Sequence, residues 1–368
     1  MRIAFLGDIA LFGCNTVRDG SYVHRFAAIK SVLDTCDCVV GNLETPLTER
    51  RKTIGGKSAY IKGSSEDVEL LKYLGVTHVT LANNHIFDYR QQGFEDTVRV
   101  LDDNHIEWFG VNDKAIRLQS ADARVALRGY CCYSTNAKML RKRAPHVNVL
   151  DPGTIECDVE EDRRDGFFSV LCMHWGIEHL QLPGPDHILL ARKLAHSGSV
   201  LIHGHHPHVI QGIETIDRSL IAYSLGNFCF DDVYTNKSAE PLIRLSQDNQ
   251  ESFVLIVEIT ETGTGKTEVV PFSFADGTYR IDAAVTAKID ERSDKLDLDM
   301  ETIEKQRKME LRDYLRGRKK KRDLNWYLKR MNVDSVRMIL SAAYNTKRYN
   351  KLIRSYIHDT ETPGIGEQ

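Results

Sequence analysis

Long hydrophobic runs are absent from this sequence of 368 residues, and so are internal repeats and low-complexity linkers. No stretch approaches the roughly 20 apolar residues that a membrane-spanning helix needs. The first residues, Met1–Asp8, read as a short strand and lack the apolar stretch and small-residue cleavage site of a signal peptide. The sequence therefore predicts a chain without a membrane span, located in the cytoplasm.

Paired cysteine motifs are absent as well. None of the eight cysteines belongs to a CxxC pair, and together they form no dense framework of the kind found in small secreted proteins. Cys36 and Cys38, like Cys131 and Cys132, are too close in sequence to bridge each other easily. We therefore predict free thiols buried in apolar segments.

The composition is that of an ordinary globular protein, with 42% hydrophobic, 27% charged and 8% aromatic residues. This excludes a disordered or fibrous chain. The net charge of -3 excludes the binding of polyanions by bulk charge alone. Charge is nevertheless unevenly distributed, because residues 301–368 contain 17 Lys and Arg against 9 Asp and Glu. This net charge of +8 leaves -11 for residues 1–300.

Residues 1–275 alternate short β-branched or apolar runs with amphipathic stretches, a pattern typical of strands interleaved with helices. The predicted strands are Arg2–Leu6, Cys38–Asn42, His78–Ala82, Val125–Tyr130, Ser169–Met173, Val200–Ile202, Ser219–Ser224 and Ser252–Ile259. The predicted helices are Tyr22–Leu33, Ser65–Leu74, Gln91–Asp103 and Pro185–His196. We therefore predict one α/β sandwich domain over residues 1–275.

Residues 276–368 have a different character, because Gly and Pro become rare and charged residues mix with Leu, Tyr, Ile and Met at helical spacing. We predict a helical, basic C-terminal extension. Its basic run, Arg316–Arg322, is followed by Trp326 and Tyr327. The run could contact an acidic partner or an acidic membrane surface, or it could form only a solvated helix face. Nucleic acid is not the partner that we expect.

Polar side chains gather where five predicted strands end. The segments are Gly7-Asp8, Gly41-Asn42-Leu43-Glu44, Asn83-Asn84-His85-Ile86-Phe87-Asp88, His174-Trp175-Gly176-Ile177-Glu178 and His203-Gly204-His205-His206-Pro207-His208. The carboxyl ends of strands in an α/β sheet converge on one edge, where loops aim side chains at a shared ligand. Asp, Glu, Asn and His form a mixed oxygen and nitrogen set that suits Mn²⁺, Zn²⁺ or Fe²⁺. A divalent metal site explains all five segments together.

Most of these segments also have an ordinary structural interpretation. Asp8 could cap a turn or a helix, Glu44 could be a surface carboxylate, and Asn83-Asn84 could form an Asx turn. His174 could be a satisfied core histidine. The segment His203–His208 differs, because four histidines in six residues beside Gly204 and Pro207 have little structural rationale.

The order of these motifs resembles the calcineurin-like metallophosphoesterase superfamily, and within it the CapA-type branch of capsule and poly-γ-glutamate biosynthesis proteins. The resemblance covers about residues 1 to 235 and rests on GDIALFG, GNLETPLT, VTLANNHIFDY, LCMHWGIEH, IHGHHPHVIQGIE and AYSLGNF in the family's order. It implies a four-layer α/β/β/α metallophosphoesterase-like sandwich with a metal site at the loop edge. The helical C-terminal extension lies beyond it.

The resemblance also implies roles for individual residues. The metal ligands would be Asp8, Glu44 in the position of the usual bridging aspartate, Asn84, His174, His206 and His208. His85 would be the catalytic histidine, oriented by Asp88 three residues further on. His205, Trp175, Asn227 and Lys62 would lie near the substrate, and Lys57 is a second candidate for contact with an anionic group.

The implied chemistry is hydrolysis of a phosphoester or a related bond with one or two divalent metals, of which Mn²⁺ is favoured over Zn²⁺ and Fe²⁺. His85 would serve as general acid. Two positions depart from the superfamily's pattern. Ala10 stands where a histidine ligand is usual, which removes one ligand from one metal, and Glu44 is longer than the usual aspartate.

Two hypotheses follow for the function. The first is a metal-dependent hydrolase that acts on an anionic small-molecule or polymer substrate in capsule or exopolymer biosynthesis. The second is a non-catalytic accessory protein that binds poly-γ-glutamate or a polysaccharide intermediate, and the absence of a histidine at Ala10 favours it. The sequence fixes neither the oligomeric state nor the bond that is cleaved.

Overall fold

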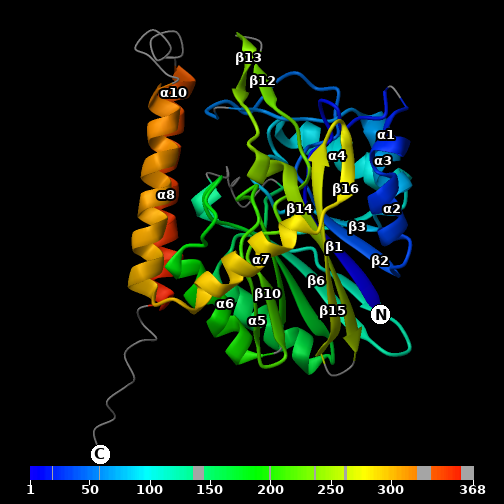
Figure 1. Cartoon of the computed structure of the whole chain (residues 1–368), viewed down its shortest axis with the longest axis vertical. Coiled ribbons are helices and arrows are strands. Elements are labelled where there is room, and N and C mark those ends of the chain that lie inside the picture. Colours follow the sequence, from blue (N-terminus) through cyan, green and yellow to red (C-terminus); the bar gives the residue numbers. More distant parts are fainter. Residues whose placement is uncertain are drawn as a thin grey trace, which may run out of the picture.

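The computed structural model describes residues 1–357 apart from residues 19, 58, 136–144, 199, 236–237, 261–262 and 321–332. Two mixed β-sheets form its centre, and helices lie on their outer sides (Figure 1). The chain reaches this arrangement because buried strands of Val, Ile, Leu and Phe alternate with amphipathic helices that cover them.

The first sheet combines a parallel half and an antiparallel half. In spatial order its strands are β16 (Thr278–Ile281), β15 (Gly263–Ala275), β14 (Glu251–Thr260), β1 (Arg2–Ile9), β2 (Cys38–Leu43), β3 (His78–Thr80) and β4 (Glu107–Phe109), and β11 (Asn227–Cys229) also pairs with β1. Strands β1 to β4 run parallel, whereas β14, β15 and β16 pair antiparallel. The parallel half brings the carboxyl ends of β1, β2 and β3 to one edge.

The second sheet has a parallel centre with an antiparallel strand on each side. Its strands in spatial order are β5 (Ile116–Gln119), β6 (Arg124–Cys131), β7 (Phe168–His174), β8 (Val200–His205), β10 (Ser219–Ala222) and β9 (Ile213–Ile216). A separate hairpin pairs β12 (Val233–Thr235) with β13 (Ser238–Ile243). Strands β7 and β8 lie side by side in parallel, so their last residues, His174 and His205, are direct neighbours in the register.

The helices divide between the two outer faces and the C-terminal part of the chain. They are α1 (Tyr22–Arg25), α2 (Ala27–Leu33), α3 (Val68–Leu74), α4 (Arg90–Asp103), α5 (Pro152–Arg164), α6 (Pro185–Ser197), α7 (Ala284–Asp294), α8 (Met300–Lys320) and α10 (Val333–Tyr349). Short 3₁₀ turns occur at Ser65–Asp67, Tyr133–Thr135, Gln247–Gln250 and Lys295–Asp297, and a π-helical turn at Asn350–Arg354 follows α10.

Three hydrophobic cores show how these elements are layered. The first core joins α2, α3 and α4 to the outer face of the first sheet, for example through Ile29, Leu71 and Leu101. The second fills the space between the sheets and includes Phe5 and Val170. The third joins α5 and α6 to the outer face of the second sheet. This succession is the predicted four-layer α/β/β/α sandwich, so the fold class is confirmed.

The C-terminal helices pack on the helical layer of the second sheet. Leu296, Ile303, Ile353 and Ile357 belong to the third core, beside α5 and α6. The first sheet extends through β16 to Ile281, and the helical part begins with α7. Within the described residues, no helix is both long and apolar enough to cross a membrane. Of the basic run 316–322, residues 316–320 belong to α8, whereas 321, 322, 326 and 327 lie outside the described residues.

Most predicted elements are present, with local differences. The predicted helix over 22–33 is divided at Phe26, which is buried and stacked on Tyr279. Helix α5 was not predicted, because its buried face contains only Pro152, Ile155, Val159 and Asp162. All eight cysteines are free, as predicted, but only four of them are fully buried.

Candidate metal centre

The polar segments of five strands meet at one edge of the sandwich. Asp8 is near the end of β1, Glu44 follows β2, Asn84 lies four residues beyond β3, and His174 ends β7. His206 and His208 follow β8 and have positive φ angles of 92° and 59°. All six side chains are buried. These residues are therefore brought together as the sequence predicts.

Glu44 lies at the centre of the group. It is 0% exposed, and neither of its carboxylate oxygens has a hydrogen-bond partner. Its Oε1 lies 3.8 Å from His174 Nε2, 3.9 Å from His208 Nε2 and 4.0 Å from His85 Nε2. Burial raises the pKa of Glu44 to about 8. A buried carboxylate without a partner is costly, and a cation held between it and the imidazoles would remove that cost.

Asp8 and His208 form one side of the centre. Asp8 Oδ2 lies 3.3 Å from His208 Nδ1, and Oδ1 accepts a hydrogen bond of 2.7 Å from the Asn42 amide. Burial alone raises the pKa of Asp8, but His205 and His208 outweigh it and hold this pKa well below its usual value. Asp8 is therefore an anion in the folded protein. Burial lowers the pKa of His208, yet the carboxylates of Glu44 and Asp8 raise it to about 10.

His174 and His206 form the other side of the centre. Burial lowers the pKa of both imidazoles, that of His206 to about 3. They are therefore neutral, which is the state in which histidine binds metals. His174 Nε2 also lies 3.2 Å from Asn84 Oδ1, so an amide oxygen faces the same point.

The donor atoms fit divalent metal ions. Two groups, Asp8 with Glu44 and His208, and Glu44 with His174 and His206, each place their donor atoms within 4.8 Å of one another. Glu44 belongs to both groups, which is what a bridging carboxylate requires. Carboxylate oxygens and imidazole nitrogens suit Mn²⁺, Zn²⁺ or Fe²⁺. The described residues can therefore hold a divalent metal at this edge.

His85 and Asp88 lie beside this group and are linked to a lysine. His85 Nδ1 donates to Asp88 Oδ2 at 2.7 Å, and Lys57 Nζ donates to Asp88 Oδ1 at 2.6 Å and to the Asn84 carbonyl at 2.8 Å. Burial, and then the charge of Lys57, lower the pKa of His85. The lone pair of a neutral His85 is consequently on Nε2, the nitrogen that faces Glu44.

The residues predicted to lie near substrate have different places. Asn227 Oδ1 accepts a hydrogen bond of 2.9 Å from His208 Nδ1 and so positions that ring. His205 Nδ1 lies 3.2 Å from Asp8 Oδ1. Trp175 is 1% exposed and its indole donates to the Tyr223 carbonyl within the third core. Lys62 donates to the Arg50 carbonyl. The structure thus brings neither Trp175 nor Lys62 to the centre.

Several residues of the centre were not assigned from the sequence. Asn42 donates to Asp8, and Asn83 donates to Asn42 while accepting from the backbone of His85. Glu178 forms a third group of donor atoms with His206 and His208. Glu178 follows His174 by only four residues in the same loop, and this proximity to a predicted ligand is the signal that could have found it.

Gly7 is expected to tolerate no side chain, because a Cβ atom there would lie 2.1 Å from the Gly226 carbonyl oxygen. That oxygen accepts the backbone N–H of Asp8 at 3.0 Å. We predict that Gly7→Ala lowers the free energy of unfolding by about 1 to 3 kcal/mol and reduces metal content. Urea denaturation and elemental analysis would measure both. Gly153→Ala, whose Cβ would meet nothing nearer than 3.5 Å, is the matched control and should leave both unchanged.

Two stacked mixed sheets between helical layers, with carboxylate, amide and imidazole groups at the strand ends, define an α/β/β/α sandwich protein with a candidate metal centre. Within this class, residues 2–232 match the family described as bacterial capsule synthesis protein PGA_cap. The chain belongs to this family.

Several curated proteins are similar to the chain. The PGA biosynthesis protein CapA of Bacillus subtilis (strain 168) is 28% identical over 296 residues, which cover 76% of this chain and 73% of that protein. The capsule biosynthesis protein CapA of Bacillus anthracis is 28% identical over 278 residues, covering 72% of this chain and 64% of that protein. A probable polyglutamine synthesis accessory protein of Mycobacterium tuberculosis is 28% identical over 211 residues, covering 53% and 55%.

Solved structures with a distant similarity include nucleotidases. A putative 5'-nucleotidase from Staphylococcus aureus has a TM-score of 0.45 and 13% identity, and the match covers 80% of this chain and 58% of that chain. The NAD nucleotidase of Haemophilus influenzae has a TM-score of 0.40 and 13% identity, with coverage of 84% and 60%.

Proposed function

We propose that the chain is a metal-dependent hydrolase that acts on a phosphoester or a related anionic substrate in capsule or exopolymer biosynthesis. The observation that carries this proposal is Glu44, a fully buried carboxylate without a hydrogen-bond partner that lies within 4.0 Å of nitrogens of His174, His208 and His85. Membership in a capsule synthesis family supports the biological setting.

Manganese is the cation that we propose, with zinc or ferrous iron as alternatives and one or two ions per chain. Asp8 and His208 would hold one ion, His174, His206 and Asn84 the other, and Glu44 would contact both. Such ions supply a nucleophilic water at neutral pH and stabilise the negative charge that develops on the substrate. The protein's part is to keep the donors fixed, which the hydrogen bonds from Asn42 to Asp8 and from His208 to Asn227 achieve.

His85 would deliver a proton to the leaving oxygen from Nε2. Asp88 holds Nδ1, so the ring is fixed with Nε2 turned toward Glu44. In the free protein, burial and Lys57 keep His85 neutral by lowering its pKa. An anionic substrate placed beside Nε2 would favour the charged ring, because an opposite charge raises the pKa of an imidazole. Protonation would then accompany substrate binding.

Lys57 is a positioning residue for His85 and Asp88, and its side chain is only 11% exposed. We predict that Lys57→Gln lowers kcat about 10-fold, the scale of losing a group that orients a catalytic residue. Metal content should stay unchanged, because Lys57 donates to the backbone carbonyl of Asn84 and not to the side-chain amide that is the proposed ligand. Steady-state kinetics with elemental analysis would test this.

The control for this prediction is Lys72→Gln, since Lys72 is exposed on α3 and pairs with the exposed Glu69. Its kcat should equal that of the wild type. Recovery of activity in Lys57→Arg, which keeps the charge, would support a positioning role. Unchanged kcat in Lys57→Gln would contradict it.

A non-catalytic accessory function is the second candidate, and Ala10 favours it. The methyl side chain of this buried residue has no atom that can bind a metal. Its backbone N–H donates to the Cys229 carbonyl at 2.8 Å. The Asp8 side of the centre therefore has fewer ligands than the superfamily pattern supplies. An accessory protein would use the centre to bind poly-γ-glutamate or a polysaccharide intermediate without cleaving it.

The direct test is a screen of synthetic phosphomonoesters and phosphodiesters with the manganese-loaded protein. The proposal expects release of the leaving group that is abolished by a chelator and restored by manganese. Binding of polyglutamate with no turnover of any ester would instead support the accessory function.

A further inference from the structure

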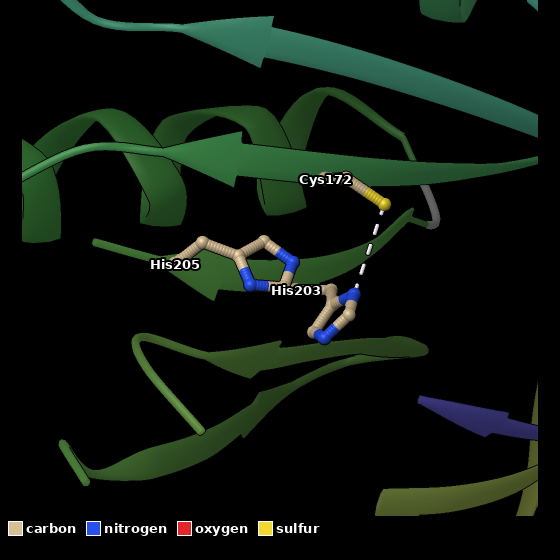
Figure 2. Close-up of side chains that lie close together, drawn as sticks. All are labelled: Cys172, His203 and His205. Carbon is tan, nitrogen blue, oxygen red and sulfur yellow. Dashed lines mark hydrogen bonds between the residues drawn. The ribbon is translucent and has the colours of Figure 1, made fainter. Parts of the chain in front are cut away.

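A second group of side chains of metal-binding types lies next to the candidate centre, on the neighbouring strands β7 and β8. Cys172 on β7 and His203 on β8 are register partners, and His205 follows on the same face of β8 (Figure 2). All three are buried, with at most 1% exposure, and their donor atoms lie within 4.8 Å of one another. The centre described above does not use Cys172 or His203.

The orientation of His203 determines which of its ring nitrogens carries a hydrogen. Its Nε2 lies 2.8 Å from the Leu6 carbonyl oxygen, which can only accept, so Nε2 carries the hydrogen. Nδ1 is then a free lone pair, and it faces Cys172 Sγ at 3.7 Å. When no metal is present, the Cys172 S–H group can donate to this nitrogen across the same contact. A metal ion in place of that hydrogen would meet a thiolate and a bare nitrogen.

His205 supplies the third direction. Both of its ring nitrogens are buried and have no hydrogen-bond partner, and Figure 2 shows the ring turned with one of them toward Cys172 and His203. Nδ1 points to Asp8, with 3.2 Å between Nδ1 and Oδ1. An unpartnered, fully buried imidazole nitrogen is costly, and a shared metal ion would satisfy it.

The surroundings of both histidines match those of metal ligands. A ligating histidine usually passes its other ring N–H to a carboxylate or a backbone carbonyl. Here His203 has the Leu6 carbonyl on its other side, and His205 has the Asp8 carboxylate. The 3.7 Å between sulfur and nitrogen also agrees with the about 3.5 to 3.8 Å expected between a sulfur and an imidazole nitrogen around one zinc-sized ion.

We propose that Cys172, His203 and His205 form a second metal site for a thiophilic ion, Zn²⁺ or Cu⁺. One thiolate and two imidazoles favour such ions, whereas the oxygen-rich centre at Glu44 suits manganese. Metal on His205 Nε2 fixes the hydrogen on Nδ1, which then donates to Asp8 Oδ1. The metal site therefore orients the Asp8 carboxylate through His205. It goes beyond the proposed hydrolase function and does not depend on it.

Loading must accompany folding, because the three side chains are closed to solvent. The full-length chain would be refolded from denaturant with Zn²⁺ or, under anaerobic conditions, with Cu⁺, and X-ray absorption spectra would be recorded at the metal edge. We expect one sulfur neighbour per chain for at least one of these metals, because the centre at Glu44 contains no cysteine. We also expect Cys172→Ser to remove this sulfur neighbour and to weaken binding of that metal at least about 100-fold.

Cys229→Ser is the matched control, because Cys229 is another fully buried, free cysteine in a strand. It should keep the sulfur neighbour. Cys172→Ala, which adds no hydroxyl, replaces the serine variant if the latter does not fold, and manganese content reports whether the other centre is intact. Zinc and copper spectra without sulfur would overturn the proposal, as would a sulfur neighbour that persists without Cys172. Either result would mean that Cys172 and His203 form only a hydrogen bond between a thiol and an imidazole.

Discussion

His85→Ala is expected to lower turnover about 100-fold or more while leaving metal content close to that of the wild type. The loss is that of a general acid. Metal content should persist because His85 Nε2 is 4.0 Å from Glu44 and belongs to none of the donor groups that surround Glu44. Asp88 keeps a partner in Lys57, so the buried carboxylate is not left alone.

The measurement is kcat of the manganese-loaded variant, with elemental analysis of the same sample. His196→Ala is the control, since His196 lies exposed in the last turn of α6. Turnover of His85→Ala within a few-fold of the wild type would remove His85 from the mechanism and favour the accessory function. Loss of metal in parallel with turnover would show that His85 is a ligand or supports one.

Glu44→Gln is expected to abolish metal binding and activity while leaving the metal-free protein at least as stable as the wild type. The substitution keeps the shape of the side chain and removes the carboxylate that both donor groups share. Burial raises the pKa of Glu44 to about 8, so the metal-free fold already disfavours its charge. A neutral amide therefore removes the free-energy cost of burying this carboxylate. Only the metal-bound protein loses stability, because it loses a ligand.

Thermal unfolding with and without manganese would measure both effects. The wild type should gain stability on adding manganese, by an amount set by the ratio of metal concentration to Kd, and Glu44→Gln should gain none. Glu69→Gln, an exposed residue paired with Lys72, should behave as the wild type. A metal-free Glu44→Gln protein less stable by more than about 1 kcal/mol would contradict the view of Glu44 as an unsatisfied carboxylate.

The sandwich and the location of the centre could be predicted because both depend on local sequence patterns. Buried strands such as Ser169–Met173 and Val200–Ile202 are continuous apolar runs, and the polar segments follow directly after them. Parallel pairing then brings strand ends together without further information. The predicted helix Pro185–His196 corresponds to α6, which begins at Pro185 and is followed by Gly198.

The surroundings of the centre could not be predicted, because they depend on where loops pass in three dimensions. Lys57 and Lys62 differ by five residues in one loop, yet only Lys57 reaches Asp88. Trp175 directly follows His174, but its ring turns into the third core, where its indole finds the Tyr223 carbonyl. Strand β15 was also missed, because its Gly, Thr and Lys residues and Pro271 obscure the strand pattern.

The group of Cys172, His203 and His205 could not be predicted for a related reason. His203 was interpreted only as a member of the histidine-rich segment and His205 as a residue near the substrate, whereas the structure places both within β8. Alternation along the strand turns them to the face that carries Cys172, and His206 begins the loop toward Glu44. One residue at the end of a strand thus separates two chemically different donor groups.

Metal content per chain after manganese reconstitution, measured by elemental analysis beside an Asp8→Ala/His206→Ala variant, tests the central claim most directly. This variant removes one donor from each of the two groups that share Glu44. We predict one or two manganese ions per wild-type chain and none in the variant. Equal metal contents in the two proteins, or no manganese in either, would contradict a metal centre at this edge of the sandwich.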